Sequence, residues 1–515
     1  MKRSRLISQG SLDRLLKTAY AALERKDFQT GIEALESANR LAPSNARILL
    51  QLGNVYGMRY DYPAAERCFE QALRFAPSKR VMLVAVANHC HYFRNTELLE
   101  RYLRRSLDEP DATSLDCLKL AELCERLHRL PEATQLVERA LNLDPADPAA
   151  LVISARLERT TGRLEQAEQR LRSTVSKPIP DTWTHALAWY ELGNILDRQE
   201  KYDDAMSAYL QAKSLLRAQA DKDFGRLKIQ SSGLKMIESS ISAGMLQRWF
   251  ENGPAFAPQR RLALLCGYPR SGTTLLEQVL DAHPGMVSSE ETEIFADDAL
   301  PPLKRDFKPD APLLRILEDA GMPALNQARK KYFRSMELSL GQPVGERLLI
   351  DKNPILTAQI PAFFRIFPET KFLVGLRDPR DVVLSRFLIP QPIVPLTTPF
   401  LTLEGTVDDY VATMSLWRAL APILPAPSLE VRYEDLVDDV EAVARKVLNF
   451  MGVEWDARVL AFDKHTRTKM VRSPTYADVA QPIYKRAKGR WRNYQKYFEP
   501  YQTILAPFVK AFGYE

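Results

Sequence analysis

Two short segments of the sequence combine arginine with hydroxyl residues directly after an apolar run. The first is Gly267–Thr274, GYPRSGTT, which follows Leu262–Cys266. The apolar run predicts a buried strand, and the spacing of apolar residues in Leu275–Leu280 predicts a helix after the loop. In such a strand, loop and helix, backbone N–H groups and the helix N-terminus point at an anion. The segment is therefore a candidate phosphate or sulfate loop.

The loop has the outer glycine spacing of a nucleoside triphosphate loop but not its lysine. Thr273 stands where that lysine would follow the second glycine, and the cation, Arg270, lies inside the loop. A kinase or an ATPase needs the lysine on the β- and γ-phosphates. The sequence therefore argues against both of these enzyme classes.

The second segment begins with the apolar run Phe372–Leu376, which predicts another buried strand. Arg377 follows it directly, and Ser385 comes eight residues later. An arginine fork and a hydroxyl suit a phosphate group. Alone, a strand-end arginine is more often part of an ordinary salt bridge, so this indication depends on its pairing with the first loop.

A third segment, Gln481–Tyr494, is basic, and Lys485, Arg486 and Lys488 are its candidates for a phosphate contact. A basic run is also typical of a solvated face or a nucleic-acid patch. Here a nucleotide with two phosphate sites already explains the run. We therefore expect no nucleic-acid partner.

These three segments together resemble the sulfotransferases that use 3′-phosphoadenosine 5′-phosphosulfate (PAPS). Pro269–Thr274 resembles their 5′-phosphosulfate loop, and Arg377 with Ser385 resembles the pair that holds the 3′-phosphate. The resemblance implies PAPS as co-substrate, adenosine 3′,5′-bisphosphate as product, and no metal. The residues that it assigns to the nucleotide are Pro269, Arg270, Ser271, Gly272, Thr273, Thr274, Arg377, Ser385, Tyr433, Ser473, Lys485 and Lys488.

The order of motifs is most similar to that of the protein-tyrosine sulfotransferases. Asp281–Pro284, Glu290–Thr292, Asp351–Pro354 and Val431–Leu436 occur in the same order as in that family. The chain departs from the animal enzymes at Glu293, where they carry an arginine that helps read acidic peptides. A Golgi-type membrane anchor is a second feature of those enzymes that this sequence lacks.

Sulfo transfer is an in-line displacement, so cations must lie where charge builds on the bridging and sulfo oxygens. Arg270 and Lys352 suit this role, and the hydroxyl of Ser473 is a further candidate. The acceptor hydroxyl must lose its proton, which requires a general base. The resemblance assigns that base to Glu291, whereas neighbouring Glu290 is expected to be structural or to face the substrate.

Histidine and metal chemistry are weaker alternatives. His283 and His465 are the two histidines of this half of the chain, and His283 is expected to be a packed or capping residue. No cluster of histidine, cysteine, aspartate or glutamate has the spacing of metal ligands, so no metal is expected.

The first half of the chain carries an internal repeat of 34 residues, as in Ala46–Lys79. Small, aromatic and proline residues recur at the positions typical of tetratricopeptide repeats, at Leu52, Gly53, Tyr56, Ala65, Phe69, Ala72 and Pro77. Small residues let two helices approach closely, and single helical hairpins must stack to bury their apolar faces. Five or six hairpins fit between about residues 12 and 215, and residues 80–113 match worst.

The resemblance to tetratricopeptide repeats implies a concave surface that can hold a protein or peptide, which could be the substrate. Alternatively, the array only packs on the second half of the chain or pairs two copies into a homodimer. The fold alone does not decide its use.

The composition is typical of a globular protein and indicates in which cellular compartment the protein works. Five cysteines, a low and odd number without a Cys-x-x-Cys pair, favour a reducing compartment over a disulfide framework. We find no signal peptide and no apolar run long enough to span a membrane. The net charge of +6 is mild for this length. These features predict a cytoplasmic protein with no membrane partner.

The predicted fold is a helical array followed by an α/β domain. An α-solenoid of tetratricopeptide hairpins covers 12–215, a helical connector covers 216–258, and a sulfotransferase domain with a parallel, P-loop-like sheet covers 259–515. Three functions follow: sulfo transfer to a peptide tyrosine or another hydroxyl, transfer to a glycan, lipid or small molecule, and a non-catalytic scaffold. The last is disfavoured because Arg270, Arg377 and Ser385 all remain competent to bind the nucleotide.

Overall fold

The computed structural model describes residues 2–220, 224–308, 310–394, 397–466 and 485–514. The chain divides into two compact units. The first unit runs to Asp147 and includes Phe333–Pro343. The second runs from Pro148 to Tyr332 and resumes at Val344. The predicted domain boundaries at 215 and 258 stay a prediction, since they rest on the repeat pattern rather than on contacts.

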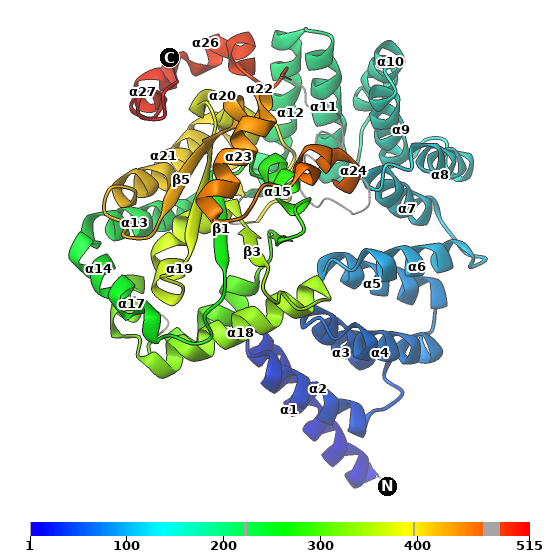
Figure 1. Cartoon of the computed structure of the whole chain (residues 1–515). Helices are drawn as coiled ribbons and strands as arrows, with labels where there is room; N and C mark the ends of the chain where they lie inside the picture. The colour runs from blue at the N-terminus through cyan, green and yellow to red at the C-terminus, as the bar shows by residue number, and fades with distance from the viewer. Residues whose placement is uncertain (1, 221–223, 309, 395–396, 467–484, 515) are drawn as a thin grey trace. The chain divides into compact units, whose positions relative to one another are not determined.

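The first unit is built from helical hairpins (Figure 1). Its helices are α1 (Lys2–Glu24), α2 (Phe28–Leu41), α3 (Ala46–Met58), α4 (Tyr62–Phe75), α5 (Lys79–Tyr92), α6 (Thr96–Leu107), α7 (Ser114–Arg126) and α8 (Leu130–Leu143). Residues 80–113, which match the repeat pattern worst, still form a hairpin because they bury Leu83, Val86 and Tyr102.

Local sequence explains where these helices begin and how closely they pack. Asp27, Asn45 and Asp61 each accept a hydrogen bond from a backbone N–H in the first turn of the next helix. A Cβ atom on Gly53 would lie 2.5 Å from the ring of Phe69. Only glycine therefore lets α3 approach α4 this closely, as the repeat pattern predicts.

Two further hairpins belong to the second unit. They comprise α9 (Pro148–Thr160), α10 (Leu164–Val175), α11 (Thr182–Arg198) and α12 (Tyr202–Ala220), which α13 (Phe224–Ser240) and α14 (Ala243–Asn252) follow. A glycine also allows α11 and α12 to pack closely. A Cβ atom on Gly193 would lie 2.7 Å from the ring of Tyr209.

A five-stranded parallel sheet forms the centre of the second unit. Its strands are β1 (Leu262–Gly267), β2 (Met286–Glu290), β3 (Leu348–Lys352), β4 (Lys371–Leu376) and β5 (Ser428–Arg432), in the order β2-β3-β1-β4-β5. The predicted strands at 262–266 and 372–376 are confirmed as β1 and β4, and the structure pairs them as parallel neighbours. The strand order reverses at β1, and ligands of open α/β sheets bind beyond the carboxyl ends of strands at such a point.

Helices pack around the sheet (Figure 1), and α15 (Thr273–Asp281), α22 (Tyr433–Asp438) and α23 (Val440–Met451) contact its strands directly. The other helices after β1 are α16 (Pro301–Lys304), α17 (Leu313–Asp319), α18 (Met322–Leu340), α19 (Ile360–Ile366), α20 (Pro379–Phe387), α21 (Leu403–Leu420), α24 (Phe462–Thr466), α26 (Gln495–Phe498) and α27 (Gln502–Ala511). Short single-turn helices include η2 (Phe295–Ala299), η3 (Pro354–Gln359), η4 (Thr398–Leu401), η6 (Arg490–Tyr494) and η7 (Glu499–Tyr501). The predicted fold class, tetratricopeptide-type hairpins and a parallel α/β domain, is confirmed.

No helix in the described ranges is both long enough and apolar enough to cross a bilayer. All five cysteines are free thiols. The cytoplasmic location and the homodimer stay predictions.

Candidate active site

The loop between β1 and α15 has the geometry of an anion cradle. Gly272 takes a φ of 85° and Arg270 a φ of 82°, so the backbone turns sharply just before α15 begins at Thr273. Ser271, Thr273 and Thr274 are buried at this helix N-terminus, while Pro269 and Arg270 are partly exposed. The N–H groups of a helix start and of such a turn favour a bound anion.

Close backbone contacts hold this loop against its neighbours. A Cβ atom on Gly267 would lie 2.3 Å from the carbonyl oxygen of Gly375, so β1 and β4 can meet here only without a side chain. A Cβ atom on Gly272 would lie 2.5 Å from the ring of Tyr433. Tyr433, predicted to lie at the nucleotide, therefore packs directly on the loop.

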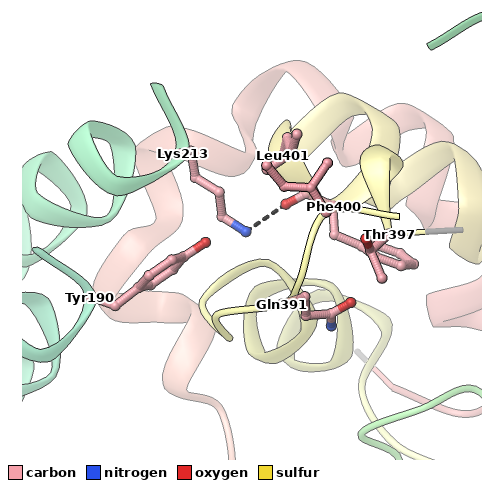
Figure 2. Close-up of a pocket in the computed structure, with 7 residues that line it drawn as sticks. Tyr190, Lys213, Gln391, Thr397, Phe400 and Leu401 are labelled. Atoms are coloured by element: carbon pink, nitrogen blue, oxygen red, sulfur yellow. Dashed lines mark hydrogen bonds between the residues drawn. The ribbon is translucent and has the colours of Figure 1, made fainter. Parts of the chain in front are cut away.

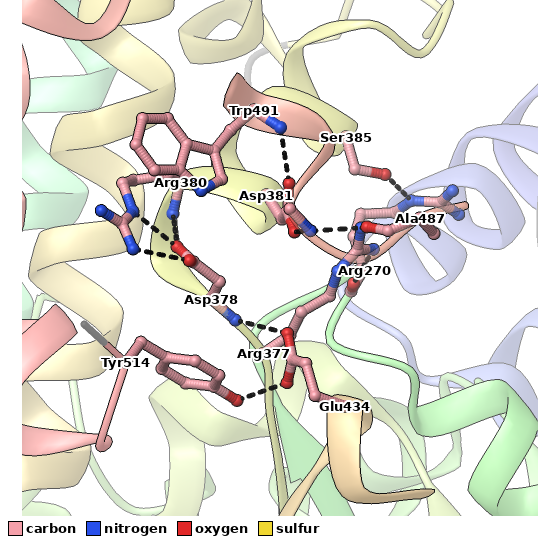
Figure 3. A network of polar contacts seen from close by, with 11 residues as sticks. Arg270, Arg377, Asp378, Arg380, Asp381, Ser385, Glu434, Ala487, Trp491 and Tyr514 are labelled. Atoms are coloured by element: carbon pink, nitrogen blue, oxygen red, sulfur yellow. Dashed lines mark hydrogen bonds and ion pairs between the residues drawn. The ribbon is translucent and has the colours of Figure 1, made fainter. Parts of the chain in front are cut away.

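The two predicted phosphate segments meet at the carboxyl ends of β1 and β4 (Figure 3). The Nε of Arg270 donates a hydrogen bond to the Ser385 hydroxyl at 3.0 Å. The Nη1 of Arg377 donates to the carbonyl oxygen of Arg270 at 3.3 Å. Arg270, Arg377 and Ser385 thus form one connected group, although Arg270 is more than 100 residues away from the other two in the sequence.

The C-terminal segment completes the surroundings of Arg377. The carbonyl oxygen of Ala487 accepts a hydrogen bond from Arg377, and the Asp381 carboxylate lies 3.9 Å from the same guanidinium. Asp381 in turn accepts hydrogen bonds from the backbone N–H groups of Gly489, at 2.6 Å, and Trp491, at 2.8 Å. The sequence reasoning missed Asp381, although an acidic residue four positions after Arg377, in the first turn of α20, was a usable signal.

Lys485 and Lys488, the two lysines predicted to contact phosphate, both pair with a carboxylate on α22. Lys485 pairs with Asp438 at 2.9 Å, and Lys488 forms an ion pair with the same carboxylate. These lysines lower the pKa of Asp438. Their backbone neighbour, Ala487, reaches Arg377, but their ammonium groups are engaged with Asp438. Ser473 lies outside the described residues.

A second group of charges surrounds Lys352 at the end of β3. Its ammonium lies 2.8 Å from Glu291, 3.4 Å from Glu277 and 3.5 Å from Glu290. Burial opposes the charged ammonium, but the three carboxylates together raise the pKa of Lys352 above its usual value. Lys352 is therefore a protonated, fixed cation.

The three glutamates differ in their access to solvent. The side chain of Glu277 is 1% exposed and that of Glu290 is 12% exposed, whereas that of Glu291 is 34% exposed. The backbone N–H of Glu291 donates to the carbonyl oxygen of Lys352 at 2.8 Å, and its φ is 47°. The end of β3 thus holds Glu291 in an uncommon conformation that presents its carboxylate outward.

His283 is a packed residue, as expected. Its Nδ1 accepts a hydrogen bond from the Gly285 N–H at 3.0 Å, and its Nε2 lies 2.9 Å from the Glu454 carbonyl oxygen. Both ring nitrogens are therefore used within the fold. In the described part of the chain, no group of histidine, cysteine, aspartate and glutamate side chains is arranged to hold a metal ion.

Arg386 is a further charged residue that sequence reasoning missed, and no motif marks it. Its guanidinium lies 3.9 Å from the ring centroid of Phe400, and its Nε is buried without a hydrogen-bond partner in the described structure. Burial lowers the pKa of Arg386, an effect that Tyr268, Asp409 and Glu291 oppose. It therefore lies within electrostatic reach of Glu291.

Two family models match this chain. The sulfotransferase family model matches residues 263–457, which include all of the sheet except Leu262, the first residue of β1. Residues 263–457 form a sulfotransferase-family domain. A tetratricopeptide repeat model matches residues 155–222, which include α11 and α12. The predicted combination of tetratricopeptide repeats with a sulfotransferase-family domain is confirmed.

Curated relatives match at low identity. An uncharacterized protein of Aquifex aeolicus is 25% identical over 404 residues, which is 75% of this chain and 50% of the relative. Protein-tyrosine sulfotransferase A of Caenorhabditis elegans is 29% identical over 205 residues, which is 38% of this chain and 50% of the relative. The chain thus spans about half the length of these relatives.

Among solved structures, the sulfotransferase domain from the Synechococcus PCC 7002 olefin synthase matches with 22% identity and a TM-score of 0.36. The match covers 50% of this chain and 96% of that domain.

Proposed function

We propose that the chain is a PAPS-dependent sulfotransferase that moves a sulfo group to an acceptor hydroxyl. The observation that carries the proposal is the convergence of the loop after β1, Arg377 and Ser385 after β4, and Lys352 with Glu291 beside β3. Anion-binding groups and a carboxylate base thereby lie at the carboxyl ends of adjacent strands, where ligands of such sheets bind.

The residues present fit the nucleotide. The backbone of Gly267–Thr274 supplies N–H groups for the 5′-phosphosulfate. Arg377 and Ser385 suit the 3′-phosphate, and the buried Nε of Arg377 has no hydrogen-bond partner in the described residues. PAPS supplies an activated sulfo group when bound. Tyr433 packs on both Gly272 and Arg377, so it is placed to contact the adenine ring of the nucleotide.

Lys352 and Arg270 stabilise the negative charge that develops in the transition state. In the transfer, a bond forms between the acceptor oxygen and sulfur while the bond from sulfur to the phosphate oxygen breaks. Negative charge then grows on the leaving oxygen, where preplaced cations stabilise it. The Lys352 ammonium suits this role because three glutamates keep it charged and fixed.

Glu291 serves as the general base. It takes the acceptor proton as the new bond to sulfur forms, and its contact with Lys352 orients the carboxylate. Glu290 is less exposed and lies further from Lys352, so it is a structural member of the group.

A protein or peptide tyrosine is the acceptor that we propose to test first. Relatives named protein-tyrosine sulfotransferase support this choice. The tetratricopeptide repeats suit binding of such a protein or peptide.

The test combines nucleotide binding with transfer. Full-length protein is titrated with adenosine 3′,5′-bisphosphate and with ATP, and is then incubated with radiolabelled PAPS and a panel of tyrosine peptides, glycans and phenols. We expect the bisphosphate to raise the melting temperature and label to enter one acceptor class. Arg377→Ala should weaken bisphosphate binding by about 1.5–3 kcal/mol. Stabilisation by ATP alone would contradict the proposal.

A further inference from the structure

A cavity separate from the nucleotide residues lies between α12 and the C-terminal helices of the second unit. It opens to solvent and has a volume of about 500 Å³, which is within the usual range for small-molecule sites. Its lining residues are Met206, Leu210, Lys213, Ser214, Arg217, Phe387, Leu401, Thr402, Leu403, Lys496, Tyr497, Pro500 and Tyr501. None of them belongs to the phosphate loop or is among the residues predicted to bind the nucleotide.

The lining is apolar with a basic edge. Three of the described lining residues, Lys213, Arg217 and Lys496, are basic, and none is acidic. Lys496 already pairs with Asp203 at 2.7 Å, on a partly exposed rim. Lys213 is the most buried of the three, with 4% of its surface exposed.

Lys213 is a buried cation without a carboxylate partner in the described structure. Its ammonium donates to the carbonyl oxygen of Phe400 at 2.5 Å and lies 4.6 Å from the ring centroid of Phe387 and 5.4 Å from that of Tyr190. A buried charge is normally paired, because its desolvation is otherwise costly. Burial, with the like charge of Arg386, lowers the pKa of Lys213 to about 7.

Figure 2 shows Lys213 reaching from α12 toward the Phe400 carbonyl, with Tyr190 beside it. The Tyr190 hydroxyl is buried and has no hydrogen-bond partner in the described residues. Lys213 thus lines the large cavity on one side and a narrow pocket with Tyr190 on the other. An ammonium has three N–H donors, and the described contacts account for one of them.

We propose that this cavity is a binding site for an organic anion with an apolar or aromatic body, whose anionic group pairs with Lys213. The apolar surfaces of Met206, Leu210 and Phe387 suit the body. An anion would supply the missing counter-charge of Lys213 and stabilise its protonated form. This site is additional to the proposed transfer reaction and does not depend on it.

The test uses two fluorescent probes that differ in one anionic group. The anionic probe is 8-anilinonaphthalene-1-sulfonate, and the neutral one is N-phenyl-1-naphthylamine, which has the same rings without the sulfonate. Full-length protein is first saturated with adenosine 3′,5′-bisphosphate, so that the nucleotide site is blocked. Each probe is then titrated into the protein and followed by fluorescence.

We expect Lys213→Met to weaken binding of the sulfonate probe about tenfold or more, and to change binding of the neutral probe far less. Lys201→Met is the matched control. Lys201 directly precedes the same helix and lies outside the cavity, where it pairs with Glu168. This control should bind both probes like the unaltered protein.

A second pair of variants avoids any change at a buried position. Leu210 lines the cavity and is 48% exposed, so the fold should tolerate both Leu210→Glu and Leu210→Gln. The glutamate variant should bind the sulfonate probe several-fold more weakly than the glutamine variant, because only it adds a negative charge. Equal binding by these two variants, or unchanged sulfonate binding in Lys213→Met, would overturn the proposal.

Discussion

The three glutamates around Lys352 differ in burial and in backbone conformation, and these differences assign them different roles. Glu277 is enclosed and accepts a hydrogen bond from the Ser288 hydroxyl at 2.9 Å. Glu290 ends strand β2 with little exposure, whereas Glu291 follows it with a positive φ and an accessible carboxylate. A base must reach the proton that it takes, so Glu291 is the member of this group able to contact an acceptor.

Glu291→Gln should abolish most of the transfer activity while keeping the nucleotide site. The amide retains the shape and hydrogen bonding of the carboxylate but cannot take the acceptor proton. Turnover should fall by about 10²- to 10⁴-fold, the usual contribution of general base catalysis. Single-turnover transfer from labelled PAPS measures the loss, and calorimetry with adenosine 3′,5′-bisphosphate should show little change in affinity.

Glu290→Gln is the internal control and should cost far less activity. If the Glu290 variant proved inactive and the Glu291 variant active, the base would be the residue before the one assigned. If neither mattered and His283→Ala abolished transfer, a histidine-based mechanism would replace the glutamate one.

At the scale of elements, a repeat helix supports the nucleotide site. Asp197 on α11 pairs with Arg490 at 2.9 Å and accepts a hydrogen bond from the Tyr494 hydroxyl at 2.5 Å. Arg490 stands between Gly489 and Trp491, whose N–H groups hold Asp381 beside Arg377. A chain of direct contacts thus links α11 to the proposed 3′-phosphate arginine.

Asp197→Asn should weaken binding of adenosine 3′,5′-bisphosphate about fivefold, or roughly 1 kcal/mol, because η6 and Asp381 become less fixed. Asp203→Asn is the matched control, since Asp203 pairs with Lys496 on α26, directly after η6, but is 69% exposed. Calorimetry measures both affinities, and melting temperatures without nucleotide report any general loss of stability. Equal affinities for both variants would show that the α11 contact does not position the site.

Local patterns predicted the elements better than the contacts between them. Apolar runs before Gly267 and Arg377 located β1 and β4, and the glycine loop located the N-terminus of α15. The repeat spacing predicted the close approach at Gly53. The pairing of Asp197 with Arg490 was not predictable, because it joins residues almost 300 positions apart without any motif.

The same limit applies to the basic C-terminal segment. Its charges suggested direct phosphate contacts from Lys485 and Lys488, yet both ammonium groups pair with Asp438. The sequence shows that basic residues cluster in this segment. The direction of each side chain depends on a carboxylate, Asp438, that is distant in the sequence. Arg386 shows the converse, since its burial and stacking on Phe400 arise from tertiary packing alone.

At the scale of the whole molecule, the last two hairpins belong with the sulfotransferase-family domain. The second unit begins at Pro148 and includes α9–α12. Lys213 of α12 donates to Phe400 of η4, and Asp197 of α11 pairs with Arg490 of η6. Removing these hairpins would expose buried surface of the domain and break the contacts that support Arg377.

Two truncated chains test this division. A fragment that begins at Pro148 should bind adenosine 3′,5′-bisphosphate within about threefold of the full chain, because all the proposed nucleotide residues lie in the second unit. Its melting temperature should be lower, since Phe333–Pro343 lose the first-unit helices that pack with them. A fragment that begins at Arg260 lacks α11 and α12, and should aggregate or bind the nucleotide at least about tenfold more weakly. Calorimetry and size-exclusion chromatography measure both quantities. If the Arg260 fragment were monomeric and bound nucleotide like the full chain, the hairpins would be independent of the site, and the boundary expected near residue 258 would be the functional one.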